Sequence, residues 1–236
     1  MKVFKTLFTN PLLFLRTAYG LFIRFYKVYI LRDKFTIEVV RWFQDQGDKT
    51  LRLNYSDLNE NSIVFDIGGY LGDFAHDINQ KYNCRVYLFE PHPKFHAHCM
   101  QRFASNEKIT SLNYGLSDID GEFILSDRVD GSSFLNPNHA KDDGIKCELR
   151  EFFSVLDSLN VKNIDLMKIN IEGGEYPLLQ HISKENRFDV VINYQIQFHN
   201  FVENAFTMRN DIIESLSKTH KQTWCYPFVW ENWNKN

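Results

Sequence analysis

The sequence predicts an α/β fold in which a mainly parallel sheet carries helices on both faces. Three observations lead to it: 44% of the 236 residues are apolar, short apolar strands alternate with helices after residue 62, and a glycine loop follows the first strand. The apolar fraction is large enough for one full core. We therefore expect one Rossmann-like domain over residues 51–236, preceded by a separate segment over residues 1–50.

Apolar runs and turn residues assign the individual elements in chain order. Asp120 and Gly121 form a dipeptide typical of a hairpin turn, between a strand ending at residue 116 and one beginning at residue 122. The expected strands are residues 62–66, 85–89, 109–116, 122–125, 164–171, 188–194 and 223–228, and the expected helices are residues 73–81, 93–105, 155–159, 176–182 and 203–217. Open sheets of this kind bind ligands at the carboxyl ends of their strands, so the residues that follow each strand are the candidates for a site.

Composition narrows the class of partner. The chain has 27 basic and 30 acidic residues and a net charge of −3, which gives no general affinity for nucleic acid. The four cysteines are widely spaced and form no metal or disulfide framework, so we expect reduced cysteines in a cytoplasmic protein. Neither a signal peptide nor a bilayer-spanning run is expected.

The amino-terminal segment differs from the rest of the chain. Residues 1–32 contain six basic residues and no acid before Asp33, and from Leu12 the apolar residues recur at helical spacing. This pattern predicts a basic amphipathic helix. We favour a helix packed on the domain or on a second subunit of a homo-oligomer; peripheral contact of residues 1–32 with the inner face of an anionic membrane is the alternative.

The glycine loop has the sequence DIGGYLGD over residues 66–73. Gly68 and Gly72 are four residues apart, so the loop departs from the G-x-G-x-x-G pattern of dinucleotide sites. Asp66 and Asp73 at its mouth would repel a diphosphate, whereas they favour a cofactor that carries a sulfonium and an ammonium. The loop itself supplies Gly68, Gly69, Tyr70 and Gly72 as cofactor-binding candidates.

An acidic residue follows the second strand. Glu90 comes 24 residues after Asp66, which is the length of one strand–helix–strand unit, and its carboxylate can accept hydrogen bonds from two ribose hydroxyls. Pro91 then begins the loop beside it. Enzymes that use NAD can share this acid, so the spacing of the glycines carries the distinction between the two kinds of cofactor.

Four segments of the sequence resemble the FkbM-type family of methyltransferases. They are IVFDIGGYLGDF (63–74), LFEPHP (88–93), NYGLSDIDGEF (113–123) and LMKINIEGGEYPLL (166–179). The resemblance implies a Rossmann-like fold, S-adenosylmethionine as the methyl donor and usually O-methylation, often of sugars or of hydroxyls on complex metabolites. It also implies that Asp66, Gly68 and Gly72 line the cofactor loop, that Glu90 holds the ribose, and that Ser117 and Asp118 lie beside the adenine.

The family pattern is broken at one position. The family has an aspartate two residues after the lysine of the last segment, and this chain has Asn170. An asparagine cannot act as a base, although it can still bind the amino-acid end of the cofactor through hydrogen bonds. Glu172 could restore the missing charge.

Catalytic candidates follow the fourth and fifth strands. Lys168 lies in a buried strand, where a charge is hard to explain by packing alone, although a structural Lys–Glu pair would also account for it. Gln195, Gln197 and His199 alternate with apolar residues and are expected to share one face. His199 suits a general base because its ordinary pKa is near neutral. Glu172 and Glu175 are the alternative bases.

Several assignments stay open. No metal is assigned, since His92, His96 and His98 match no strong metal signature, although assistance from a metal at Glu172 and His199 is compatible with the sequence. Residues 126–146 could bind the acceptor through their polar side chains, or they could form an ordinary loop. The tryptophans near the carboxyl terminus could stack on a sugar of the acceptor, or they could cap the core. These residues are Ser132, Ser133, Asn136, Asn138 and His139 in the loop and Trp224, Trp230 and Trp233 in the tail.

Taken together, the sequence predicts an O-methyltransferase that uses S-adenosylmethionine and acts on a sugar hydroxyl of a glycan or glycoconjugate precursor. A Rossmann-type nucleotide-sugar oxidoreductase or epimerase is the first alternative, because it needs a similar loop. The second is a non-catalytic module that binds the cofactor, which the loss of the aspartate at position 170 makes conceivable.

Overall fold

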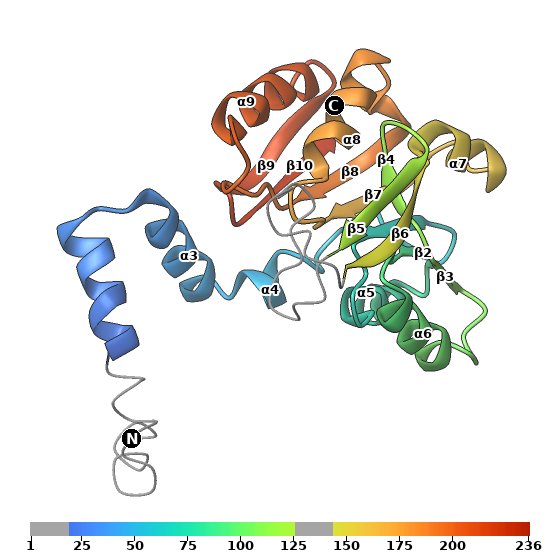
Figure 1. The fold of residues 1–236 in the computed structure, drawn as a ribbon, viewed down its shortest axis with the longest axis horizontal. Helices are drawn as coiled ribbons and strands as arrows, with labels where there is room; N and C mark the ends of the chain where they lie inside the picture. The colour runs from blue at the N-terminus through green and yellow to red at the C-terminus, as the bar shows by residue number, and fades with distance from the viewer. Residues whose placement is uncertain (1–18, 126–143) are drawn as a thin grey trace, which may run out of the picture.

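A computed structural model describes residues 19–125 and 144–236, and it has a central seven-stranded sheet between two layers of helices (Figure 1). Five strands run parallel, in the order β3-β2-β1-β7-β8, and β10 and β9 complete the sheet in antiparallel fashion. The predicted mainly parallel α/β fold is therefore confirmed. The strands are β1 (Ile63–Ile67), β2 (Arg85–Phe89), β3 (Ile109–Leu112), β7 (Ile164–Ile169), β8 (Val191–Ile196), β9 (His220–Tyr226) and β10 (Trp230–Lys235).

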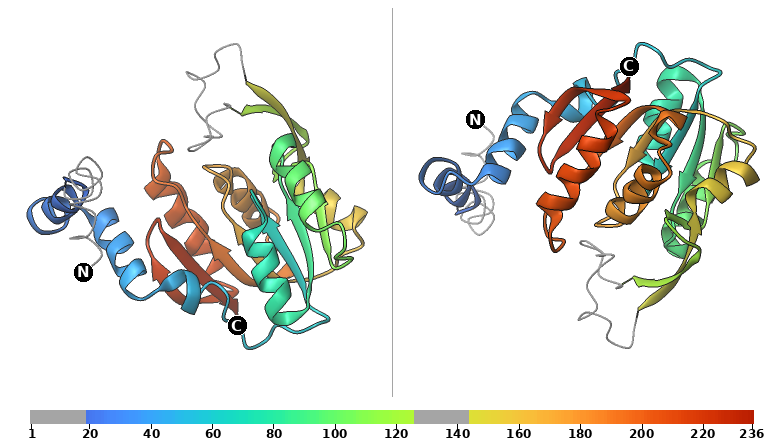
Figure 2. Two further views of the ribbon diagram at one scale, coloured as in Figure 1. Left: turned by 90° about the horizontal axis from the view of Figure 1, so that it is seen from below. Right: turned by 90° about the horizontal axis from the view of Figure 1, so that it is seen from above.

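Helices cover both faces of this sheet, as Figure 2 shows from two further directions. One face packs on α5 and α6, through buried residues that include Ile78 and Cys99, and the other packs on α7, α8 and α9, through residues that include Leu178 and Ile212. Alternate residues of each strand enter the two cores, so Val64 lies in the first and Phe65 in the second. The helices are α5 (Asp73–Tyr82), α6 (Pro93–Arg102), α7 (Phe152–Ser158), α8 (Glu175–Lys184) and α9 (Ala205–Leu216), with a 3-10 turn η3 (Phe188–Val190) before β8.

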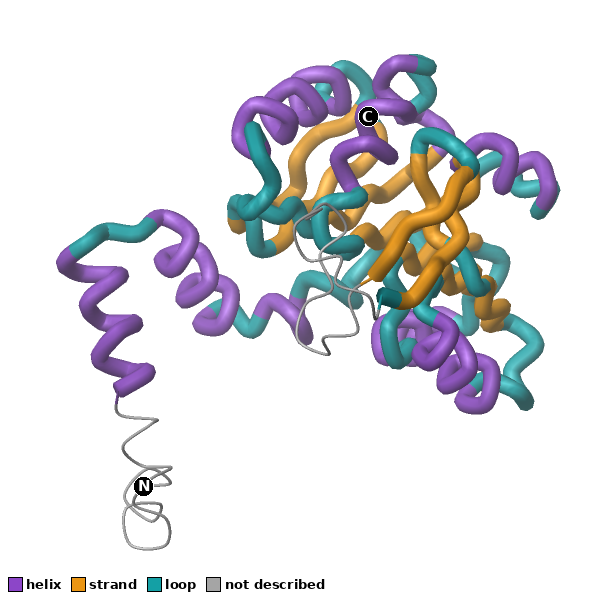
Figure 3. Tube along the Cα trace, in the orientation of Figure 1, coloured by secondary structure: helices purple, strands orange, loops and turns teal. Residues whose placement is uncertain are grey.

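A second sheet of three strands corrects the predicted hairpin. It consists of β4 (Gly115–Ser117), β6 (Ile145–Glu151) and β5 (Gly121–Leu125) in that order, so β6 separates the two strands that were expected to pair. Figure 3 shows which parts of the described chain are strand, helix and loop. The strand expected over residues 109–116 also divides, because β3 ends at Leu112 and β4 joins the other sheet. Charged residues of β6 alternate with its two buried side chains, Cys147 and Leu149, which is the pattern of a strand with one buried face that the sequence analysis overlooked.

The carboxyl-terminal strands were only partly predicted. One strand was expected near residues 223–228, whereas the chain forms a hairpin of β9 and β10. Trp230 and Trp233 are each only 6% exposed and belong to hydrophobic cores, and Trp224 packs against Trp42 with ring centroids 5.7 Å apart. All three tryptophans therefore pack on the core, as one of the two predicted alternatives has it, and Trp230 and Trp233 are too buried to stack on a sugar.

The amino-terminal segment joins the domain through two helices. Residues 19–25 are helical and continue into a π-helical turn, η1 (Tyr26–Ile30), which is followed by α3 (Lys34–Gln44) and α4 (Gly47–Thr50). The Asp33 side chain caps α3 by accepting from the Thr36 amide at 2.8 Å. Trp42 of α3 packs edge-on against Tyr226 of β9, with ring centroids 5.1 Å apart. This contact fixes α3 to the end of the sheet.

Two predicted features lie wholly or largely outside the described residues. They are the first part of the basic helix, over residues 12–18, and residues 126–143 of the candidate acceptor loop expected over residues 126–146. In the part of the chain that the structure describes, no helix has the length and apolar character needed to span a bilayer.

Candidate active site

The glycine loop lies at the carboxyl end of β1 and is held there by its own amides. The amides of Gly68 and Gly69 both donate to the Phe89 carbonyl, at 3.0 and 3.1 Å, and the Tyr70 amide donates to Glu90 Oε2 at 2.7 Å. A loop that binds phosphate presents its amides to the ligand instead. With these three amides already engaged by β2, the loop is poorly suited to a diphosphate.

Gly68 must be a glycine for steric reasons. Its φ of +81° lies in the left-handed region, and a Cβ placed there would lie 2.0 Å from the Asn170 carbonyl oxygen on the neighbouring strand end. The close approach packs the loop onto the residue that follows β7. The glycine loop and Asn170, which were selected separately from the sequence as cofactor-binding candidates, are therefore in contact.

We expect Gly68→Ala to reduce the free energy of unfolding by about 2 kcal/mol or more, since it combines backbone strain with a backbone clash. Urea denaturation followed by circular dichroism would measure the change. Gly121→Ala is the matched control, because a Cβ there meets no atom within 4 Å. Equal midpoints for the two variants would contradict the proposed steric role of Gly68.

Glu90 connects the loop to the start of the next helix. It is 6% exposed, and besides the Tyr70 amide it accepts from the His92 amide at 2.9 Å through Oε1. Burial raises the pKa of this carboxyl to about 7, against the opposing effect of the two amide hydrogen bonds. Each oxygen keeps a further lone pair, so the carboxylate can still accept from ribose hydroxyls as predicted.

Lys168 is buried and bound on two sides. Its ammonium donates to Asp66 Oδ1 and to the Gly68 carbonyl, both at 2.8 Å. Burial lowers the pKa of this lysine, and the adjacent Asp66 carboxylate opposes the shift. Lys168 thus fastens the glycine loop to β7, and its partner is the aspartate of β1 rather than the glutamate considered from the sequence.

Two buried acceptors lack partners at the adjoining ends of β1 and β7. Asp66 Oδ2 and Asn170 Oδ1 accept no hydrogen bond from the described residues. The strands are direct neighbours, and the Asn170 amide donates to the Ile67 carbonyl at 3.0 Å. Buried acceptors without donors are costly, and an ammonium group supplies three donors. These two atoms are therefore free to accept from an ammonium group, which is what the prediction requires of residues at the amino-acid end of the cofactor, and Asn170 can accept without a charge.

His199 lies between two glutamates beyond the end of β8. Its Nδ1 is 3.0 Å from Glu175 Oε1, which also accepts from the His199 amide at 2.8 Å, and its Nε2 is 3.6 Å from Glu172 Oε2. Burial alone would lower the pKa of His199, but the two carboxylates outweigh it and raise the pKa to about 9. The structure thus brings together three of the four predicted catalytic residues.

The backbone at Glu172 is strained in a way that positions its side chain. Glu172 has a φ of +51° and Gly173 a φ of +105°, and the Gly173 amide donates to Glu175 Oε2 at 2.9 Å. A non-glycine residue in the left-handed region is uncommon and carries a cost of about 1 kcal/mol or more. The Glu172 side chain is 39% exposed, so it is the member of the cluster most open to an incoming acceptor.

Gln195 does not join this cluster, which corrects the expected shared face of Gln195, Gln197 and His199. The strand ends at Ile196, so the alternation does not continue to residue 199. Gln195 instead donates to the Tyr55 hydroxyl at 2.6 Å and accepts from Arg52 Nε at 3.1 Å. Sequence reasoning missed Arg52 and Tyr55, because they lie in an irregular stretch and meet Gln195 only in the folded chain.

The predicted adenine residues lie at the end of β4. Ser117 is 3% exposed, and its hydroxyl donates to Asp118 Oδ1 at 2.9 Å. Asn113, which was quoted in a motif but not selected, donates to the carbonyls of Glu90 and Pro91, both at 3.0 Å. It thereby fixes the loop after β2 to the end of β3. Sequence reasoning missed it because the strand was expected to continue to residue 116, which placed Asn113 inside a strand, whereas β3 ends at Leu112.

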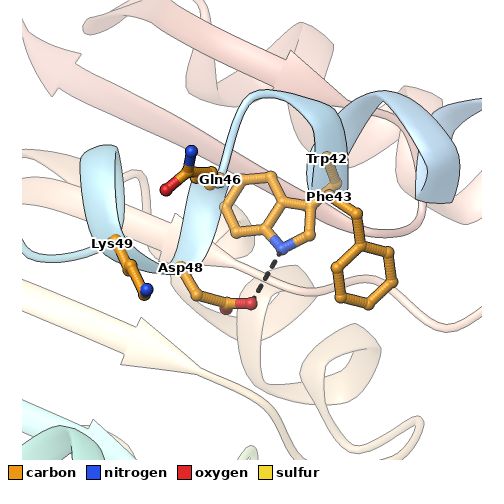
Figure 4. Close-up of a pocket in the computed structure, with 6 residues that line it drawn as sticks. Trp42, Phe43, Gln46, Asp48 and Lys49 are labelled. Carbon is orange, nitrogen blue, oxygen red and sulfur yellow. Dashed lines mark hydrogen bonds between the residues drawn. The ribbon is translucent and has the colours of Figure 1, made fainter. Parts of the chain in front are cut away.

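Two other kinds of site, a metal site and a surface hollow, were sought in the described residues. No group of three or more His, Cys, Asp or Glu residues within 19–125 and 144–236 is arranged to hold a metal ion. A hollow of about 280 Å³ lies at the junction of α3 and α4, beside the Trp42 indole, which donates to Asp48 at 3.3 Å (Figure 4). It shares no residue with the glycine loop or with the His199 cluster.

Comparison with known proteins decides the family. A model of the FkbM methyltransferase domain matches residues 66–219, which span the glycine loop, Glu90, Lys168 and His199. The chain belongs to the FkbM methyltransferase family. The predicted S-adenosylmethionine-dependent methyltransferase is therefore confirmed, and the family assignment rejects the nucleotide-sugar oxidoreductase or epimerase.

Solved structures resemble the FkbM chain only distantly. A putative rRNA methylase from Clostridium thermocellum is 11% identical, with a TM-score of 0.49 over 82% of this chain and 97% of that one. A putative methyltransferase from Streptococcus mutans, in complex with S-adenosylhomocysteine, is 9% identical, with a TM-score of 0.49 over 76% and 91%. Fibrillarin from Aeropyrum pernix, with bound S-adenosylmethionine, is 11% identical, with a TM-score of 0.45 over 83% and 74%. A comparison with curated proteins found no match.

Proposed function

We propose that this FkbM methyltransferase methylates a hydroxyl group, and that the acceptor is a sugar of a glycan or glycoconjugate precursor. The observation that carries the proposal is the His199 cluster, in which a histidine and an exposed glutamate lie beyond the carboxyl ends of β7 and β8. A hydroxyl becomes a good nucleophile only when a base removes its proton, whereas an amine or a thiolate acceptor has less need of such a group.

In the proposed reaction, one group of residues binds the cofactor and another group acts on the acceptor hydroxyl. On one side, Glu90 would accept from the ribose hydroxyls of the cofactor, while Asp66 and Asn170 would accept from its ammonium. When bound, S-adenosylmethionine would supply an electrophilic methyl on a sulfonium, whose leaving group is a neutral thioether. On the other side, neutral His199 takes the hydroxyl proton as the new carbon–oxygen bond forms, and Glu175 keeps the imidazole oriented and stabilises its cationic form.

The pH dependence of turnover follows from this assignment. Below pH 9 most of His199 is protonated and cannot accept a proton, so kcat/KM for the acceptor should rise with pH through about 9 and level off only above that value. A pH profile at saturating cofactor measures this limb. His199→Gln should remove it, whereas a limb that persists in this variant would assign the base to another group.

The acceptor class is tested by methyl transfer from radiolabelled cofactor. We expect label in the glycan fraction of an extract, stable to mild alkali as an ether is, and absent with a Glu172→Gln, His199→Ala double variant. Label in protein, nucleic acid or alkali-labile ester would contradict a sugar-hydroxyl acceptor. Cofactor binding by the double variant, measured with S-adenosylhomocysteine, shows separately that the fold is intact.

A further inference from the structure

An exposed apolar surface covers the amino-terminal helix. Eight of its aromatic and aliphatic side chains are 42% to 68% exposed, and none of the residues of η1 is buried. The rings of Phe25 and Tyr29 lie 4.7 Å apart, so the surface is continuous at that point. We define the amino-terminal apolar surface as Tyr19, Leu21, Phe22, Phe25, Tyr26, Tyr29, Ile30 and Leu31.

The helix that carries this surface stands away from the sheet. Figure 1 and both views of Figure 2 show residues 19–30 at the outer edge of the molecule, with α3 between them and the domain. The domain therefore does not cover the surface. Contiguous apolar patches of this kind are rare on monomeric proteins and mark a contact with a partner or a membrane.

The charges around the surface indicate what covers it. Residues 19–32 carry Arg24, Lys27 and Arg32 and no acidic residue, although the whole chain has a net charge of −3. Arg24 and Lys27 are three residues apart, so they lie on one side of the helix, and we call this pair the basic stripe. A broad apolar face beside a basic stripe is the pattern of helices that lie in the interface of an anionic bilayer.

The side-chain chemistry favours a lipid surface over a second copy of the chain. Three of the eight residues are tyrosines, whose hydroxyls can remain at the headgroups while their rings enter the apolar layer. Two copies of this helix would bring like charges together, with no acidic residue in residues 19–32 to pair with them. Anionic headgroups supply the missing counter-charges.

We propose that residues 19–32 form an in-plane anchor that binds this methyltransferase to the surface of an anionic lipid bilayer. The aromatic side chains enter the boundary between headgroups and acyl chains, and the basic stripe contacts the headgroups. Apolar burial and charge attraction act together, so binding weakens when either is removed.

Vesicle flotation of the full chain tests the anchor. We expect at least about tenfold more protein to float with vesicles of phosphatidylcholine and phosphatidylglycerol than with phosphatidylcholine alone, and 0.5 M salt to reduce this binding. Two double variants should each lower the amount of floated protein by about tenfold or more. The first combines Phe22→Asp with Phe25→Asp, and the second combines Arg24→Glu with Lys27→Glu. Unchanged circular dichroism shows that each variant is folded.

Matched controls keep the outcome decisive. Met100→Asp replaces an exposed apolar residue of α6, and Lys218→Glu, Lys221→Glu reverses two exposed charges elsewhere; both should float like the unaltered chain. Failure of the unaltered chain to float, or undiminished flotation of the Arg24→Glu, Lys27→Glu variant, overturns the proposal. The proposal is also overturned if light scattering detects a dimer without lipid and the Phe22→Asp, Phe25→Asp double variant is a monomer. A second copy of the chain would then cover the amino-terminal apolar surface.

Discussion

Replacing Glu90 by glutamine should weaken the binding of S-adenosylhomocysteine by about two orders of magnitude. The buried carboxylate offers charged acceptors to two ribose hydroxyls, each worth about 1.5 kcal/mol or more, and an amide retains only one weaker acceptor. Glu90→Gln is preferred to alanine because the remaining amide oxygen can still accept from Tyr70 or His92. Isothermal titration calorimetry measures the change directly.

The pH dependence of this binding gives an independent check on Glu90. Burial raises its pKa to about 7, so protonation removes an acceptor as the pH falls below that value. Affinity of the unaltered chain should therefore fall between about pH 8 and 6, and that of Glu90→Gln should not. The matched control is Asp165→Asn, because Asp165 also accepts from a backbone amide, that of Ile63 at 2.7 Å, but at the opposite edge of the sheet. An equal loss of affinity in Asp165→Asn would mean that Glu90 acts only through stability.

Replacing His199 by alanine should lower kcat by roughly two to four orders of magnitude, which is the usual contribution of a general base. Affinity for S-adenosylhomocysteine should stay within about twofold of the unaltered value, because the change removes an interaction that operates only during methyl transfer. Glu175 would keep its hydrogen bonds from the amides of Gly173 and His199, so the fold should survive. Single-turnover kinetics with bound cofactor would isolate the chemical step.

A second His–Glu pair provides the control for this variant. His181 Nε2, in the last turn of α8, lies 2.7 Å from Glu151 Oε1, and this pair has no place in the proposed reaction. His181→Ala should leave kcat nearly unchanged. If His181→Ala and His199→Ala lowered kcat equally, or if His199→Ala retained full activity, His199 would not be the base.

The parallel sheet and the cofactor loop could be predicted because local chemistry determines them. β2 was predicted with its observed bounds, since apolar residues end at an acid followed by a proline, and α6 was predicted to start at Pro93, where the helix begins. β6 was overlooked although its charged and buried residues alternate as in a half-buried strand, because the polar stretch before it was read as one loop. β10 could not be predicted, because its residues carry side-chain amides and it pairs with strands distant in sequence.

The candidate site was predictable in its residues but not in its contacts. Position after a strand selected Asp66, Glu90 and His199, because the carboxyl ends of parallel strands meet at one edge. The partner of Lys168 could not be read from the sequence, since Asp66 lies 102 residues earlier and meets it only through the register of β1 with β7. The raised pKa of His199 depends in the same way on a left-handed turn at Glu172.

The most direct measurement is a crystal structure of the full chain with S-adenosylhomocysteine. We expect both ribose hydroxyls within hydrogen-bond distance of Glu90, the ammonium beside Asp66 and Asn170, and the sulfur directed toward the His199 cluster. A complex whose ribose lies away from Glu90, or whose sulfur is walled off from His199 by protein, would contradict both the cofactor site and the chemistry derived from it.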